Sequence, residues 1–191
     1  MNNILKILVD AGAILEGHFL LTSGRHSNKY IEKFRLIEKP KYLDIVCDAM
    51  AKKFTNNNIN VILGAAVGGI LISGGVGQKL NVKHIFTERV NGKMKLRRGF
   101  YLNEKSNVLI VEDIVTTGGS IFELIDIVKE NKANLIGITS ILDRNNQPVD
   151  FGFNYEPLVQ YPVKSWAEDD IPEWLNKISI TKPGRSGKKQ S

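Results

Sequence analysis

The middle of this chain alternates between short apolar runs and longer stretches in which apolar residues recur at helical spacing. The short runs predict strands at residues 61–63, 84–87, 108–111 and 135–142. The longer stretches predict one helix from a turn at Gly68 and Gly69 to about Leu80, and a second helix at residues 120–130. Strand, glycine turn, helix and strand in this order make βαβ units, so we expect an α/β fold with a mostly parallel central sheet flanked by helices.

Smaller elements are predicted on either side of this pattern. The spacing predicts helices at residues 2–12, 42–54 and 166–178, and extended segments at 19–22 and 29–36 around a loop at 23–27. We expect residues 1–180 to form one domain, in which about the first 40 residues and the C-terminal part make a small hood over the site. Residues 181–191 are predicted to be a disordered basic tail.

The overall composition is that of a globular protein. With 191 residues, 42% of them hydrophobic and 24% charged, the chain can bury the core of one domain. Cys47 is the only cysteine, which excludes an intrachain disulfide and any zinc site with two thiolates. There is no apolar run of 18 residues, and the first residues lack the features of a secretion signal. These features predict a cytoplasmic protein.

The formal net charge of +6 is concentrated in two short segments. Residues 89–98 hold five basic side chains and no acid, and residues 181–191 hold four basic side chains and no acid. Without these nine, 17 of the 26 basic residues remain against 20 acidic ones, a net charge of −3. This distribution predicts one anion-binding loop and a basic tail, and it argues against a broad nucleic-acid-binding face.

The strongest chemical signal lies in residues 108–120, with the sequence VLIVEDIVTTGGS. An apolar strand leads into two acids and then into a turn rich in threonine and glycine, which opens an amphipathic helix. Backbone N–H groups around Gly118 and Gly119 can converge on an anion, and the helix dipole adds to the attraction. We therefore expect a phosphate monoester here. The alternative is a strand–turn–helix connection without a ligand, in which Ser120 is the N-cap of the helix. It would explain the glycines and the serine, but not the two adjacent acids.

The two acids, Glu112 and Asp113, would repel a phosphate and should therefore face another part of the ligand. Vicinal hydroxyl groups donate hydrogen bonds to carboxylates, so an acidic pair beside a phosphate-binding turn predicts recognition of a ribose 5-phosphate. The P-loop pattern of nucleoside triphosphatases and the GxGxxG pattern of dinucleotide-binding proteins are both absent.

Residues 108–120 resemble the motif with which type I phosphoribosyltransferases bind 5-phosphoribosyl 1-diphosphate (PRPP). Four more segments look like segments of the orotate phosphoribosyltransferases of that family, in the same order: residues 18–30 (HFLLTSGRHSNKY), 63–69 (LGAAVGG), 88–100 (ERVNGKMKLRRGF) and 141–148 (ILDRNNQP). The resemblance implies the type I phosphoribosyltransferase fold. It also implies an enzyme that transfers ribose 5-phosphate from PRPP to orotate, giving orotidine 5′-monophosphate and pyrophosphate in pyrimidine biosynthesis.

The resemblance further implies roles for the matched residues. Those expected to bind PRPP are Glu112, Asp113, Ile114, Val115, Thr116, Thr117, Gly118, Gly119 and Ser120. Those expected to bind orotate are Thr116, Arg144 and the loop Ser23, Gly24 and Arg25. Arg144 would pair with the orotate carboxylate, and an arginine at the end of a strand is indeed well placed for bidentate pairing. Asp113 is expected to act in catalysis by stabilising the cationic ribose rather than by abstracting a proton.

Residues 89–98 resemble the mobile catalytic loop of the family, which implies a homodimer in which this lid covers the neighbouring subunit's site. Arg89 and Lys93 are the lid cations expected to act on the pyrophosphate. A solvated hairpin that turns at Asn91 and Gly92 is the alternative. Mg²⁺ would be bound mainly through PRPP, with no ligand directly from a protein side chain.

Two positions depart from the better-studied form of the family, in which one lysine lies in the pyrophosphate loop and another just before Ser-Gly-Arg. Gly68 and Thr22 stand at the corresponding positions here, and the basic loop lacks that form's Lys-His-Gly pattern. We interpret the chain as a member of a subgroup with a shorter loop.

Two other functions remain open: transfer to a different base, and PRPP sensing by a regulator without catalysis. A neutral purine offers no carboxylate to Arg144, and no helix-turn-helix segment precedes the predicted sheet. Neither a membrane nor a nucleic acid is expected as a partner, although the basic composition of the tail would permit RNA binding.

Overall fold

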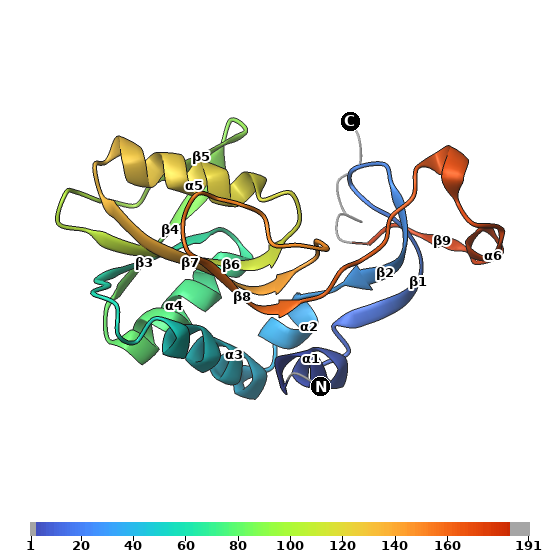
Figure 1. Ribbon diagram of the computed structural model, residues 1–191, viewed down its shortest axis with the longest axis horizontal. Helices are drawn as coiled ribbons and strands as arrows, with labels where there is room; N and C mark the ends of the chain where they lie inside the picture. The colour runs from blue at the N-terminus through green and yellow to red at the C-terminus, as the bar shows by residue number, and fades with distance from the viewer. Residues whose placement is uncertain (1–2, 184–191) are drawn as a thin grey trace.

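A six-stranded sheet with helices on both faces forms the centre of the computed structural model, which describes residues 3–183 (Figure 1). The strands lie in the order β5 (Lys93–Leu96), β4 (Lys83–Val90), β3 (Val61–Ala65), β6 (Asn107–Val115), β7 (Asn134–Asp143) and β8 (Tyr155–Gln160). Five of them run parallel, and only the edge strand β5 is antiparallel to its neighbour. The predicted mostly parallel α/β sheet is therefore confirmed.

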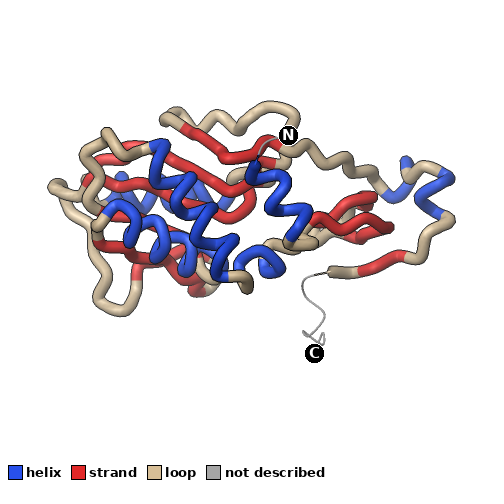
Figure 2. Tube along the Cα trace, turned by 90° about the horizontal axis from the view of Figure 1, so that it is seen from below, coloured by secondary structure: helices blue, strands red, loops and turns tan. Residues whose placement is uncertain are grey.

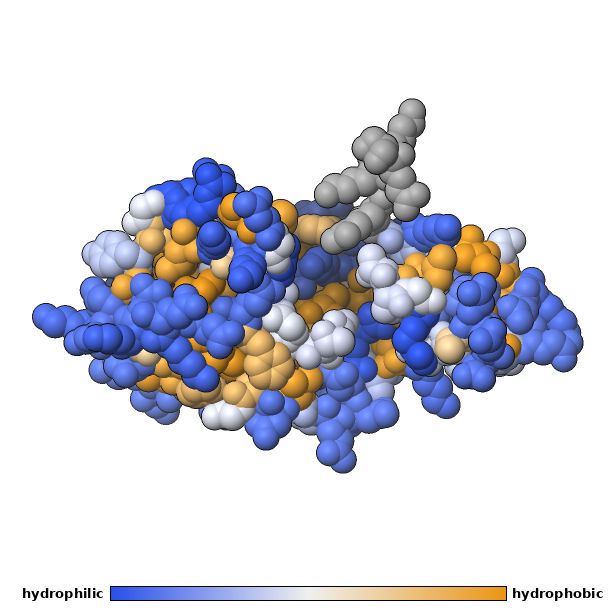
Figure 3. Space-filling view, turned by 90° about the horizontal axis from the view of Figure 1, so that it is seen from above, coloured by the Kyte–Doolittle hydropathy of each residue, from blue (hydrophilic) through white to orange (hydrophobic). Residues whose placement is uncertain are grey.

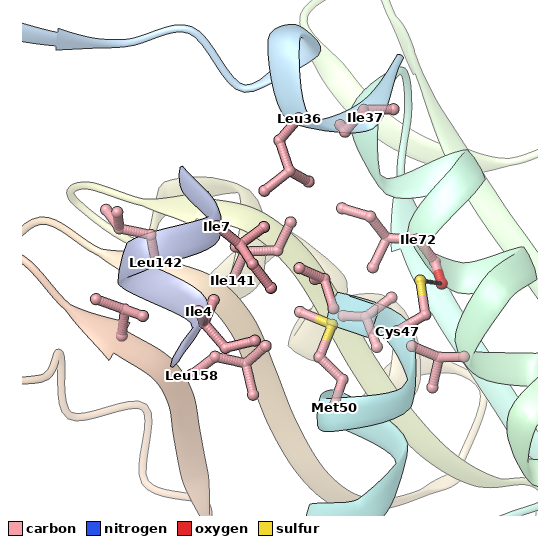
Figure 4. Packing of buried hydrophobic residues seen from close by; sticks show 14 of the residues in the cluster. Ile4, Ile7, Leu36, Ile37, Cys47, Met50, Ile72, Ile141, Leu142 and Leu158 are labelled. Carbon is pink, nitrogen blue, oxygen red and sulfur yellow. Dashed lines mark hydrogen bonds between the residues drawn. The ribbon is translucent and has the colours of Figure 1, made fainter. Parts of the chain in front are cut away.

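Helices cover both faces of this sheet, as parallel strands with few polar side chains require. On one face lie α3 (Pro40–Lys53) and α4 (Gly68–Leu80), together with α1 (Asn3–Asp10) and the single turn α2 (Phe34–Ile37). On the other face lies α5 (Gly119–Glu130). Figure 4 shows the core of the first face, where side chains of α1, α2, α3 and α4 meet those of β7 and β8. This packing fixes α2 against the sheet. It thereby also fixes the backbone of Lys33, the residue that precedes α2.

A second, three-stranded sheet stands beyond the carboxyl ends of the parallel strands (Figures 1 and 2). Its central strand β1 (Ile14–Leu20) pairs with β2 (His26–Ile31) in antiparallel fashion and with β9 (Ile180–Thr181) in parallel. We call residues 14–31 and 164–181 the hood. Segments far apart in the chain are joined within it: the Ser27 hydroxyl donates to the Lys164 carbonyl at 2.8 Å, and the buried rings of His18 and His26 are linked at 2.7 Å.

Two predicted elements are wrong. Residues 29–36 were expected to be extended, but the strand ends at Ile31 and the chain then turns into α2. This helical turn buries Leu36 and Ile37 in the core, which stabilises the turn. The local sequence pattern does not reveal this stabilisation, because it comes from contacts with distant segments. The single helix expected at 166–178 is instead a 3-10 turn, η1 (Glu168–Asp170), and a short helix, α6 (Glu173–Asn176). Pro172 separates them because it lacks an N–H donor and holds the residue before it extended.

Other predicted elements have the right type and shifted ends. The strand β6 continues through both acids to Val115, and α5 begins at Gly119 with Gly118, not Ser120, as its N-cap residue. The basic segment forms the hairpin β4–β5, which turns at Asn91 and Gly92. From residue 184 onward, the predicted tail lies outside the described residues. Among residues 3–183, no helix is long and apolar enough to cross a lipid bilayer.

Candidate active site at the sheet edge

Three adjoining cavities open where β3, β6 and β7 end. The hood cavity, about 490 Å³, lies between the hood and the loops after β6 and β7. The turn cavity, about 280 Å³, surrounds the turn at 116–120, and the loop cavity, about 180 Å³, lies against residues 65–68. Thr116 and Thr117 line both the hood cavity and the turn cavity. Figure 3 shows a recess between the sheet body and the hood. Because the turn cavity shares lining residues with each of the other two, one extended ligand can reach from cavity to cavity.

The turn cavity is built from backbone at the start of α5. Gly118 has a φ of +78°, and a Cβ atom there would lie 2.7 Å from the ring of Phe151, so both the conformation and the space require glycine. No side chain caps the helix, which leaves the N–H groups of its first turn directed at the cavity. The cavity therefore has the donors and the dipole of an anion site, and phosphate binding by the turn within residues 112–120 stays a prediction.

The two acids lie side by side at the centre of the site and are almost fully buried. Asp113 accepts a hydrogen bond from the Ile114 N–H at 2.6 Å, and its own N–H donates to Glu112 at 2.9 Å. Glu112 lines both the turn cavity and the loop cavity, whereas Asp113 lines the loop cavity. Burial, followed by the neighbouring charge of Asp113, raises the pKa of Glu112, so this carboxyl holds its proton at a higher pH than an exposed glutamate does.

Lys33, at the start of α2, forms an ion pair with Asp113 in the loop cavity. Lys33 was not predicted as a site residue, because it belongs to none of the matched roles and lies in a segment that was expected to be extended. The one available hint was the glycine at position 68, which leaves the loop at 65–68 without a cation of its own.

The loop at 65–68 approaches the acids closely. The peptide bond between Ala66 and Val67 is cis. A Cβ atom at position 68 would collide with the Oδ2 atom of Asp113 and lie 3.4 Å from the Nζ atom of Lys33. Gly68 therefore allows the backbone to pack directly against the Lys33–Asp113 pair.

The structure brings Arg144 and Thr116, two of the residues expected to bind orotate, to the lining of the same hood cavity. The Arg144 side chain is half-buried, and its Nε–H has no hydrogen-bond partner among the described residues. Burial, which keeps water from part of the guanidinium, also lowers its pKa. A buried donor without a partner is costly, so the cavity is suited to a ligand that brings a carboxylate to Arg144.

The loop Ser23, Gly24 and Arg25 forms the hood's side of the same cavity. Ser23 and Arg25 line it, whereas Gly24, with a φ of +77°, makes the turn. The Arg25 guanidinium is already engaged by Ser165, through Nε to the hydroxyl at 2.9 Å and through Nη2 to the carbonyl at 2.7 Å. Arg25 therefore shapes the wall of the cavity, whereas the Nε–H of Arg144 has no partner among residues 3–183.

The hairpin β4–β5 brings one of its two candidate cations to the site. Arg89 lines the turn cavity and pairs with Glu123 of α5 at 2.7 Å. The other oxygen of Glu123 accepts the Met94 N–H at 2.8 Å, which ties both strands of the hairpin to α5. Lys93 lines a different cavity, between β5 and α5, so its catalytic role stays a prediction.

No group of three or more His, Cys, Asp or Glu side chains that could hold a metal ion occurs within residues 3–183. The acidic pair Glu112 and Asp113 offers carboxylate oxygens only. Mg²⁺ is commonly held by one or two carboxylates together with substrate phosphates and water, so this donor set fits an ion that arrives with a diphosphate.

The chain matches known phosphoribosyltransferases along nearly its whole length. Residues 35–151 match the family model described as the phosphoribosyl transferase domain. The chain is 41% identical over 186 residues to the orotate phosphoribosyltransferase of Thermotoga maritima, covering 97% of this chain and 100% of that protein.

Solved structures show the same fold. The orotate phosphoribosyltransferase of Aeropyrum pernix superposes with a TM-score of 0.71 at 22% identity, covering 82% of this chain and 93% of that one. An adenine phosphoribosyltransferase from Thermoanaerobacter pseudethanolicus superposes with a TM-score of 0.62 at 15% identity, covering 70% of this chain and 88% of that one. Proteins named for different bases thus share this fold, so the choice of base depends on individual residues.

Proposed function

This chain belongs to the orotate phosphoribosyltransferases of the type I phosphoribosyltransferase family, and from this premise we propose how its site carries out the reaction. It is a pentosyltransferase that transfers the ribose 5-phosphate of PRPP to orotate. The products are orotidine 5′-monophosphate and pyrophosphate, a step of pyrimidine biosynthesis. Each of the three cavities receives one part of the two substrates.

The turn cavity receives the 5-phosphate. Backbone N–H groups of residues 116–120 and the N-terminus of α5 supply donors and positive potential, and no carboxylate is needed there. Arg89 lies at the rim of this cavity, and its expected action on the pyrophosphate stays a prediction. Because the binding groups are mainly backbone atoms on a buried strand–helix joint, the phosphate fixes the position of the ribose with little reorganisation.

Glu112 and Asp113 receive the ribose hydroxyls. Both lie at the end of β6, immediately before the turn, so a ribose whose phosphate occupies the turn reaches them. As the bond to pyrophosphate breaks, the anomeric carbon develops positive charge, and the carboxylate of Asp113 stabilises that charge electrostatically. Orotate is already an anion, so no protein base is required.

The observation that carries the assignment to orotate is the unpaired Nε–H of Arg144 in a cavity shared with Thr116. A carboxylate on the base would accept from this guanidinium in a charge-assisted, bidentate pair, whereas adenine and uracil have no carboxylate to offer. Thr116 is placed to hydrogen-bond the pyrimidine ring.

Magnesium is proposed to arrive with PRPP, next to Glu112 and Asp113. When bound, it neutralises the charge of the departing pyrophosphate. The chain's own residues hold the ribose beside the ion and keep the anomeric carbon in line with the base in the hood cavity.

The assembly and the cell compartment are proposals as well. We propose a homodimer in which the hairpin at 89–98 acts as a lid on the neighbouring subunit's site. Lys93, Lys95 and Arg97 support this role, because they form no ion pair among the described residues and a bound diphosphate would relieve the repulsion between them. A cytoplasmic location is supported by the one cysteine, Cys47, which is buried and has its pKa raised to about 12 by that burial.

The reaction is tested by chromatography of products after the protein is mixed with PRPP, Mg²⁺ and one base. Orotate should give orotidine 5′-monophosphate and an equal amount of pyrophosphate, and chelation of Mg²⁺ should stop the reaction. Adenine and uracil should give no nucleotide under the same conditions. Product from adenine or uracil, or PRPP binding without any product, would favour another base or a sensor.

A further inference from the structure

We propose that Lys33 is a catalytic residue that binds the departing pyrophosphate, reaching the site from the start of α2. This inference rests on the proposed function, because it concerns the diphosphate of PRPP. It adds a residue that neither the sequence motifs nor the turn at 116–120 account for.

The arrangement of the cavities leaves one place for the diphosphate. A base that displaces pyrophosphate attacks the anomeric carbon from the side opposite to the leaving group. With the base in the hood cavity and the 5-phosphate in the turn cavity, the remaining cavity at this edge is the loop cavity. It shares Glu112, Ile114 and Ser120 with the turn cavity, so a ligand can extend from one into the other.

Lys33 is the only cationic side chain that lines the loop cavity within the described part of the chain. The other lining residues are apolar or small, apart from the acids Glu112 and Asp113. A diphosphate cannot bind against two carboxylates without positive charge nearby. Mg²⁺ supplies part of that positive charge. Among the residues that line this cavity, the ammonium group of Lys33 supplies the rest.

The backbone of Lys33 is fixed, while its ammonium group can move. Its carbonyl accepts the N–H groups of Leu36 and Ile37, both at 3.0 Å, and those two residues are buried in the core. The Lys33 side chain is 32% exposed, compared with 5% for the Asp113 carboxylate to which it is paired. A lysine on a rigid anchor with an accessible ammonium group can exchange one anionic partner for another.

The glycine at position 68 fits this assignment. A side chain on the loop could not reach the cavity in the present geometry, because its Cβ atom would collide with Asp113 and approach Lys33. The ammonium group of Lys33 therefore lies next to the backbone of the loop, in the space that a side chain at position 68 would enter. Lys33, at the start of α2, thus supplies the loop cavity with the positive charge that the loop at 65–68 does not provide.

The exchange of partners has a consequence for the reaction. Before PRPP binds, Lys33 neutralises Asp113. When the diphosphate enters, the ammonium group moves to its oxygens, and Asp113 becomes free to face the ribose. Binding of the leaving group and exposure of the catalytic carboxylate are thereby coupled through one side chain.

The test compares ligands that contain a diphosphate with one that does not. In Lys33→Met, the dissociation constant of PRPP and the inhibition constant of pyrophosphate should rise about 10- to 100-fold, as expected for loss of a hydrogen bond between charged groups. The dissociation constant of orotidine 5′-monophosphate, which has the ribose and the 5-phosphate but no diphosphate, should change less than about threefold. Lys33→Arg should restore part of the affinity for pyrophosphate.

Lys41→Met is the matched control, because it removes one exposed lysine from the first turn of α3, outside the three cavities, and should leave all three constants unchanged. Equal weakening of pyrophosphate and orotidine 5′-monophosphate in Lys33→Met would overturn the proposal and assign Lys33 a structural role beside Asp113. If Lys33→Met does not fold, Lys33→Gln gives the same comparison. Ligand binding is measured by calorimetry without turnover, so an inactive wild type would reject the proposed function while still testing Lys33.

Discussion

The side-chain nitrogen of Asn145 lies 2.6 Å from the carbonyl oxygen of Thr116 and 2.7 Å from a carboxylate oxygen of Asp143. One amide group thus ties the loop after β7, which carries Arg144, to the turn after β6. Since Arg144 and Thr116 belong to different strand–loop units, this contact sets the spacing between the two sides of the hood cavity.

Replacing Asn145 with alanine should therefore weaken orotate binding while leaving the side chains of Arg144 and Thr116 in place. We expect the KM for orotate to rise about tenfold and the free energy of unfolding to fall by about 1–3 kcal/mol, since the buried Asp143 loses a donor. Steady-state kinetics and urea unfolding measure the two effects. Asn146→Ala, at the exposed neighbouring position, is the control, and equal kinetics in the two variants would refute this role.

Gly68→Ala should separate the loop from the acids. The new Cβ atom cannot fit beside the Asp113 carboxylate, so either the loop or Asp113 must move. We expect the KM for PRPP to rise at least about tenfold and kcat to fall, because a small displacement of a reacting group is costly. The control is Gly74→Ala in the same helix, where a Cβ atom would lie 3.4 Å from the nearest atom, in the ring of His84, and which lines none of the three cavities. Unchanged PRPP kinetics in Gly68→Ala would mean that the close packing has no role.

The raised pKa of Glu112 predicts a pH-dependent stability. The folded protein retains this proton at pH values where the unfolded chain has lost it, so stability falls as the pH rises above the ordinary glutamate value of 4.5. Glu112→Gln cannot titrate. The free energy of unfolding of the wild type, relative to this variant, should therefore decrease between about pH 5 and about pH 8. Urea unfolding at several pH values measures the difference, and a difference that does not change with pH would contradict the assignment.

Glu123→Ala should loosen the hairpin β4–β5. It removes the partner of Arg89 and the acceptor of the Met94 N–H, and both contacts are partly exposed, so the cost in stability should stay below about 1 kcal/mol. We expect faster amide exchange in residues 90–97 and an altered KM for PRPP, with little change in the KM for orotate. Asp126→Ala, on the exposed side of the same helix, provides the comparison. Identical exchange in the two variants would show that Glu123 does not anchor the hairpin.

Features encoded in short, local patterns could be predicted from the sequence. The acids, the turn and the helix at 112–130 are consecutive in the chain, and apolar runs are the expected signal of buried parallel strands. The positions of Arg144 and Thr116 at the same edge of the sheet could also be predicted, because both residues follow parallel strands whose carboxyl ends meet there.

Features that depend on long-range packing could not be predicted. Lys33 reaches Asp113 across 80 positions, and it does so only because α2 turns inward to bury Leu36. The pairing of Arg89 with Glu123 likewise depends on where α5 lies against the hairpin. The helix expected at 166–178 had suitable apolar spacing, but the effect of Pro172 was given too little weight.

The most direct test of the site is the rate at which orotate absorbance is lost in the presence of PRPP and Mg²⁺, for the wild type and for Arg144→Ala. We expect magnesium-dependent turnover by the wild type and a fall in kcat/KM for orotate of about 100-fold or more in the variant, since a paired guanidinium–carboxylate contact is lost. The dissociation constant of PRPP should stay within about threefold, because Arg144 lies outside the turn and loop cavities. Undiminished turnover of orotate by Arg144→Ala would contradict the assignment of the hood cavity to the base.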